Sequence, residues 1–164
     1  MPFTSESSRL TRRVTGSAEI RTCRRRAHYR SIVTQDVWSL YGDLGGSDPA
    51  SLSDAQRGFV AILDLRQEVN AGGFDNYFRA WGGNSASEAM GALPGVLGQK
   101  WATLLHEAMQ VVGSPYPQDD PDQRAARLDA NTAADVTLSA LDERFYDLEA
   151  AADVDARLSE FVGR

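Results

Sequence analysis

The segment 70–78, Asn-Ala-Gly-Gly-Phe-Asp-Asn-Tyr-Phe, constrains the fold of this chain more than any other. Gly72 and Gly73 can take positive φ without a Cβ penalty, so the pair suits the end of one helix and an immediate re-entry into another. An aromatic stripe with the i, i+3, i+4 and i+7 spacing of one helical face begins at once: Phe74, Tyr77, Phe78 and Trp81. We expect a helical corner whose second arm, from about Phe74 to Trp81, packs these rings into the core and leaves the Tyr77 hydroxyl to satisfy a buried backbone group.

Helical periodicity continues on both sides of this corner. A first helix, carrying Val33, Val37, Leu40 and Tyr41, is expected to end between Gly42 and Gly46. Capping boxes at Ser53–Gln56 and Ser85–Glu88 predict the starts of two helices. The first of these helices is expected to end near Asn70 and the second near Gly91.

The C-terminal half carries the clearest amphipathic pattern of the chain. Its apolar stripe consists of Trp101, Leu104, Leu105, Ala108, Met109 and Val112. An acidic loop is expected over 118–122, a helix over 132–150, and a last helix capped by Asp153. No alternating strand pattern exceeds four residues. The sequence therefore predicts an all-α fold, a single multi-helix domain of the size that 164 residues allow.

The net charge of −6 hides two opposed regions. Residues 1–30 hold eight arginines against two glutamates, a net charge of +6, whereas residues 31–164 hold nine basic and 21 acidic residues, a net charge of −12. Poor in large apolar residues and lacking the apolar core of a secretory signal, the first thirty residues are predicted to form a disordered tail. There are three alternatives for this tail: a start codon assigned too far upstream, an organelle transit peptide, or a nucleic-acid-binding arm.

No motif in the chain matches a known reaction centre. His106-Glu107 lacks the second histidine of a zinc-protease motif, because Gln110 stands there, and an exposed surface histidine is expected instead. His28 and the lone Cys23 lie in the basic tail. Serine-nucleophile elbows and phosphate-binding glycine loops are absent. We expect no enzyme, no cofactor and no metal.

Acidic side chains in the C-terminal third are the remaining candidates for function. Asp135, Asp142 and Glu149 recur every seven residues and share one helical azimuth. The candidate partner-binding residues are Asp119, Asp120, Asp122, Asp135, Asp142, Glu143, Asp147 and Glu149. The alternative interpretation is that these residues form an ordinary solvated acidic face without a binding role. Amide substitutions at the last four are expected to preserve the fold.

A resemblance supports the functional interpretation. The chain resembles the bacterial DNA-mimic-protein-like domain family over roughly residues 31 to 164. The match rests on Asn70, Gly72, Gly73, Phe74, Asp75, Tyr77 and Phe78, on the Met90-Gly91-Ala92 break, and on Leu141-Asp142-Glu143-Arg144-Phe145-Tyr146. Pro94-Gly95, directly after the Gly-Ala break, departs from the family pattern.

The resemblance implies a cytoplasmic protein that occupies the DNA-binding site of a basic DNA-binding protein. The alternative is an immunity-type inhibitor of a toxin or nuclease, and the third hypothesis is an enzyme with an unrecognised carboxylate site. No membrane partner is expected, nor direct binding of nucleic acid by the acidic body. A homodimer remains open.

Overall fold

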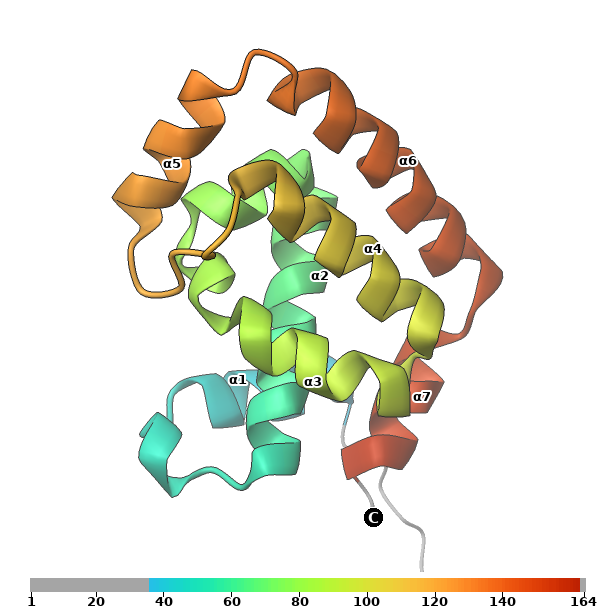
Figure 1. The fold of residues 1–164 in the computed structure, drawn as a ribbon. Coiled ribbons are helices and arrows are strands. Elements are labelled where there is room, and N and C mark those ends of the chain that lie inside the picture. Colours follow the sequence, from blue (N-terminus) through green and yellow to red (C-terminus); the bar gives the residue numbers. More distant parts are fainter. Residues whose placement is uncertain (1–35, 163–164) are drawn as a thin grey trace, which may run out of the picture. The chain divides into compact units, whose positions relative to one another are not determined.

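The computed structural model describes residues 36–162, which belong to one structural unit, and the basic segment 1–30 lies outside them. The all-α prediction is confirmed: residues 36–162 form α-helices and short 3₁₀ helices without a strand (Figure 1). The α-helices are α1 (Val37–Gly45), α2 (Asp54–Arg79), α3 (Ala86–Val96), α4 (Gln99–Val112), α5 (Pro121–Ala130), α6 (Ala134–Ala151) and α7 (Val154–Val162). The 3₁₀ helices are η1 (Pro49–Ser51) and η2 (Trp81–Ser85).

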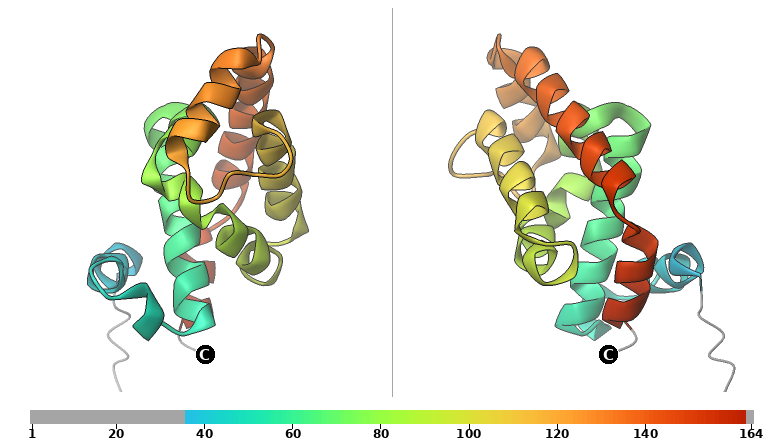
Figure 2. Two further views of the ribbon diagram at one scale, coloured as in Figure 1. Left: turned by 60° about the vertical axis from the view of Figure 1, so that its left-hand side comes forward. Right: turned by 90° about the vertical axis from the view of Figure 1, so that its right-hand side faces the viewer.

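Helix α2 forms the centre of the described unit. It contacts α1, α3, α5, α6, α7 and η2, while α4 packs between α3 and α6 (Figures 1 and 2). The α4 stripe is buried as predicted at Trp101, Leu104, Leu105, Ala108 and Val112. Local periodicity thus determines which face of each helix enters the core.

The predicted corner lies inside α2 and is confirmed. Gly72 has φ −166° and ψ 23°, and Gly73 has φ 76° and ψ −177°, so the helix breaks and resumes within two residues. The backbone N–H of Phe74 would have no acceptor in its own helix at this break. Asp142 of α6 supplies one, because its Oδ1 accepts from Phe74 N at 2.8 Å. A carboxylate from a distant helix therefore caps the second arm of α2.

The second arm ends earlier than the aromatic spacing predicts. Phe74, Tyr77 and Phe78 are fully buried, whereas Trp81 is 78 % exposed. Ala80 is extended (φ −85°, ψ 170°), which stops α2 at Arg79 and turns Trp81 away from the shared face into η2. The expectation for the Tyr77 hydroxyl is also wrong, since this buried group has no hydrogen-bond partner in the part of the chain that the structure describes.

Two of the three predicted helix caps are confirmed, and one is wrong. Ser53 and Gln56 form the predicted capping box, and Asp153 Oδ1 accepts from Ala156 N at 3.0 Å, as predicted for the cap of α7. Ser85, in contrast, makes no capping bond and donates to Gly82 O at 2.8 Å.

Two helix boundaries differ from the prediction. Helix α3 does not stop at Gly91 but continues to Val96 with Pro94 inside, because burial of Leu93 and Val96 outweighs the weak helix propensity of glycine. The predicted acidic loop is shorter than expected, because α5 begins at Pro121 and only residues 118–120 precede it. Asp120 Oδ1 accepts from Gln123 N at 2.8 Å, and Pro121 occupies the first turn.

Gly73→Val is expected to lower the free energy of unfolding by about 2–4 kcal/mol, because the positive φ strains a β-branched residue and the new side chain displaces the cap. A Cβ at this position would lie 2.4 Å from Asp142 Oδ2. Urea denaturation followed by circular dichroism measures the loss. Gly91→Ala is the control, since it lies in α3 with no atom within 4 Å of the added Cβ, and it should be neutral or stabilising. Equal stability of both variants would contradict a conformational requirement at Gly73.

Candidate partner-binding surface

Six of the eight acidic candidates are exposed carboxylates. Asp119 and Asp120 precede α5, Asp122 lies in its first turn, and Asp135 lies in the first turn of α6. Glu143 and Asp147 follow on α6, one turn apart. None of the six forms an ion pair with a residue of the described range 36–162. They present negative charge that the described fold does not neutralise.

The other two candidates lie on the same α6 azimuth but turn toward α2. Asp142 is half-buried and caps Phe74, as described above. Burial raises the pKa of Asp142, and the hydrogen bond from the Phe74 backbone opposes this effect. This carboxylate has a structural role at the Gly-Gly corner.

Glu149 pairs with Arg66, an arginine that sequence reasoning missed. Arg66 is only 7 % exposed, and its Nε and Nη2 donate to the two carboxylate oxygens of Glu149 at 2.7 and 2.9 Å. Arg66 Nη1 also donates to Asp155 Oδ1 at 2.7 Å, which joins α2 to α6 and α7. Desolvation lowers the pKa of Arg66, but the hydrogen bonds that it donates to the carboxylates of Glu149 and Asp155 outweigh this effect, and the net shift of the pKa is upward.

These contacts correct one sequence-based expectation. Amide substitutions at Asp142, Glu143, Asp147 and Glu149 together would not leave the fold untouched, because removing one partner of a buried ion pair leaves the other without full compensation. Only Glu143 and Asp147 of this set are exposed and unpaired within the described unit. The seven-residue spacing places Asp135, Asp142 and Glu149 on the same side of α6, and this side lies next to the buried face of the helix.

Arg124 is a second buried arginine that the sequence analysis overlooked. It is fully buried on α5 and donates to five neutral acceptors, four backbone carbonyls and one side-chain amide oxygen. Two of these carbonyls, Phe78 and Ala80, lie at the C-terminal end of α2, where the helix dipole is negative. Arg124 thus fixes the segment from which Asp119 and Asp120 project, because Nη1 also holds the carbonyls of Pro117 and Gln118.

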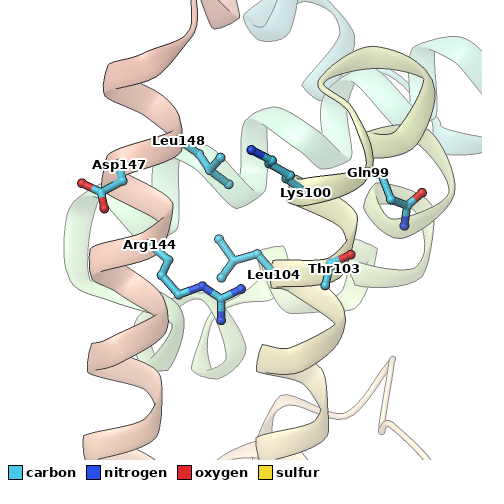
Figure 3. Close-up of a pocket in the computed structure, with 7 residues that line it drawn as sticks. All are labelled: Gln99, Lys100, Thr103, Leu104, Arg144, Asp147 and Leu148. Atoms are coloured by element: carbon cyan, nitrogen blue, oxygen red, sulfur yellow. The ribbon is translucent and has the colours of Figure 1, made fainter.

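A pocket of about 460 Å³ lies between α4 and α6 (Figure 3). Lys100 and Arg144 point into the space between the helices over Leu104 and Leu148, while Asp147 points away from α4. Arg144 forms an ion pair with Glu107 of α4. The hydrogen bond that Arg144 donates within this pair lowers the pKa of the Glu107 carboxyl. The two cations interrupt the acidic surface on this side of α6.

Few groups in the described range suit chemistry at a metal or catalytic centre. His106 is exposed on α4, as expected. Cys23 and His28 lie outside the described residues. Within residues 36–162, no three His, Cys, Asp or Glu side chains come together in a way that could hold a metal ion. Across the same range, no helix combines the length and the apolar character that crossing a membrane requires.

Comparison with known proteins gives one match. No curated protein and no solved structure matches the chain. The family model described as "DMP19-like protein" matches residues 50–163, which include the Gly-Gly corner, the Arg66 and Arg124 contacts and all eight acidic candidates. The chain belongs to the DMP19-like protein family.

Proposed function

We propose that this protein is a non-enzymatic, cytoplasmic acidic binding protein that occupies the DNA-binding site of a basic DNA-binding protein. The observation that carries the proposal is the set of exposed carboxylates without ion-pair partners in the described unit: Asp119, Asp120, Asp122, Asp135, Glu143 and Asp147. Membership of the DMP19-like family supports the same function, because this family is associated with DNA-mimic proteins.

The mechanism is competition for arginine and lysine side chains. Carboxylate oxygens accept charge-assisted hydrogen bonds from these side chains as phosphate oxygens do. Glu143 and Asp147 lie about 6 Å apart along the α6 axis, whereas duplex DNA carries about one charge per 1.7 Å of its axis. The charges of one helix are therefore too far apart to imitate DNA. The carboxylates of the loop before α5 and of the starts of α5 and α6 must contribute to the same surface.

The lining of the pocket between α4 and α6 offers no pair of groups for acid–base catalysis. That lining contains neither histidine nor cysteine, and it holds a single carboxylate, Asp147. Acid–base chemistry of the common kinds uses a histidine or a pair of groups whose environments separate their pKa values. The exposed carboxylates instead suit electrostatic steering of a basic partner.

The test compares two sets of four amide substitutions in the full-length protein. The first set is Asp122→Asn, Asp135→Asn, Glu143→Gln and Asp147→Asn, which leaves Asp142 and Glu149 in place. The control set is Asp36→Asn, Asp48→Asn, Asp54→Asn and Asp153→Asn, four exposed carboxylates elsewhere in the described unit. Both sets change the net charge equally. In the control set Asp54 pairs with Arg57 on the surface and Asp153 caps α7, a role that asparagine also fills, so the fold should be kept.

A partner isolated from host lysate should bind the first set at least about tenfold more weakly than the wild type, and the control set with little change, because exposed charge pairs act within about 10 Å. Operator DNA of the partner should displace the protein, and added salt should weaken the complex. A toxin or nuclease whose binding DNA does not oppose would support the immunity-type alternative instead. Capture that resists salt and is equal for both sets would exclude an acidic binding surface.

A further inference from the structure

A second recess lies beside the acidic loop, on the side of α2 away from α6. This cavity of about 360 Å³ is bounded by the 44–52 segment, α2, and η2 with the start of α3. Its apolar wall comprises Leu44, Leu52, Val60 and the indole of Trp81. Its polar lining includes Asp64, Ser85, Glu88 and Asp119. We call this recess the Trp81 groove.

Trp81 is the most anomalous side chain in the groove. The indole is 78 % exposed although it directly follows an arm whose aromatic residues are fully buried. Arg124 contacts residues on both sides of it, since Nη2 donates to the backbone carbonyl of Ala80 at 3.0 Å and to the side-chain Oδ1 of Asn84 at 2.7 Å. Tryptophan is enriched among the residues that contribute most to binding at interfaces, and this exposed ring stands at the apolar wall of a recess.

The polar side of the groove carries uncompensated negative charge. Asp64 is half-buried, and the groups that donate to it are neutral: the Tyr41 hydroxyl lies at 2.5 Å, and the Ser85 hydroxyl, whose one proton is shared with the nearer Gly82 O, lies at 3.3 Å. Burial raises the pKa of the Asp64 carboxyl despite these bonds. Asp64 has no ion-pair partner in the described unit. A cation entering the groove would meet a carboxylate that no other charge neutralises.

Neighbouring groups strengthen this preference for a cation. Glu88 and Asp119 add two carboxylates to the lining. Arg57, the single cation of the lining, is engaged by Asp54 and by Leu52 O at 2.7 Å.

We propose that the Trp81 groove binds an arginine side chain of the basic partner, with the guanidinium stacked on the Trp81 indole and hydrogen-bonded to the carboxylates of the groove. A guanidinium fits because it is planar, stacks on aromatic rings and donates in a fork to carboxylates. Asp119 of the lining is followed directly by Asp120 and by Asp122 in the first turn of α5, so one partner surface can reach both the groove and these carboxylates. The inference rests on the proposed function and adds its anchoring contact.

The test uses a defined probe and the full-length protein labelled with ¹⁵N. The tripeptide acetyl-Gly-Arg-Gly-amide is titrated while the indole N–H signals of Trp38, Trp81 and Trp101 are recorded. The Trp81 signal is assigned by its loss in Trp81→Ala. Acetyl-Gly-citrulline-Gly-amide has nearly the same shape without the charge, and lysine and leucine versions test an ammonium and an apolar occupant.

The arginine peptide should shift the Trp81 signal and the Asn84 and Ser85 amides in a saturable manner, and the citrulline peptide should bind at least about threefold more weakly. Trp81→Ala should abolish this binding. Val136→Ala is the matched control, because Val136 is also 78 % exposed but lies on α6, and it should bind as the wild type does. Glu88→Gln combined with Asp119→Asn should weaken binding at low salt.

Equal binding of the arginine, citrulline and leucine peptides, or stronger binding of the lysine peptide, would overturn the inference. So would a Trp81→Ala protein that binds the arginine peptide normally. The two proposals separate in the partner assay: if Trp81→Ala captures the partner fully while the four amide substitutions on α5 and α6 do not, the proposed function stands without the groove. If neither variant weakens capture, both proposals fail.

Discussion

Arg124→Met will lower the free energy of unfolding by at least about 4 kcal/mol, because hydrogen bonds to a charged donor contribute about 1.5–3 kcal/mol each and several are lost together. Arg124 is fully buried and donates to Phe78 O, Pro117 O, Gln118 O, Ala80 O and Asn84 Oδ1 at 2.6–3.0 Å. Methionine replaces the apolar part of the arginine side chain but is shorter and has no donor, so it leaves these acceptors unpaired inside the protein. Chemical denaturation followed by circular dichroism measures the effect.

The control for this variant lies one turn further along the same helix. Arg127 is partly exposed on α5 and donates to Pro115 O at 2.6 Å and to Gln123 Oε1 at 3.2 Å. Arg127→Met should lower the free energy of unfolding by less than about 1 kcal/mol, because water replaces the lost contacts. Similar losses in the two variants would mean that the five acceptors around Arg124 do not depend on it.

Phe78→Ala will lower the free energy of unfolding by about 3–5 kcal/mol, the usual result when a buried aromatic ring is truncated. Phe78 is fully buried, and its ring centroid lies 5.2 Å from that of Tyr77, 5.9 Å from that of Tyr116 and 6.1 Å from that of Phe74. Truncation creates a cavity where the second arm of α2 meets the segment held by Arg124. The same denaturation experiment measures the loss.

Trp81→Ala serves as the control for Phe78→Ala. Trp81 belongs to the same aromatic spacing in the sequence but is exposed, so its removal should change stability by less than about 0.5 kcal/mol. A stable Phe78→Ala protein would show that the aromatic arm is not the core of the unit. A strongly destabilised Trp81→Ala protein would contradict the early end of α2.

The sequence by itself determined the features that depend on a few neighbouring residues. The apolar stripe of α4 predicted its buried face, because helical periodicity is a property of consecutive residues. The glycine pair predicted the break in α2, because a positive φ such as that of Gly73 is a local restriction of the backbone. Helix α5 also has a local start signal in the sequence, because Asp120 followed by Pro121 is a common helix start.

A weaker signal also marked the buried arginines. Arg66 follows Ile62 by four residues and precedes Val69 by three, which places it on an apolar helical face, and Arg124 stands four residues before the buried Leu128. The same spacing fits an arginine that extends its charged end into water. Sequence reasoning cannot separate these two cases, because a buried guanidinium requires acceptors that other segments supply.

Tertiary structure alone decided which candidate residues face a partner. Asp135, Asp142 and Glu149 share one azimuth of α6, yet Asp135 is exposed, Asp142 caps Phe74 and Glu149 pairs with Arg66. The break at Ala80 likewise separated Trp81 from the buried aromatic residues with which it shares a spacing. The physical reason is the same in both cases. Helical geometry determines which side chains share a face, whereas the groups opposite that face come from segments that only the folded chain brings near.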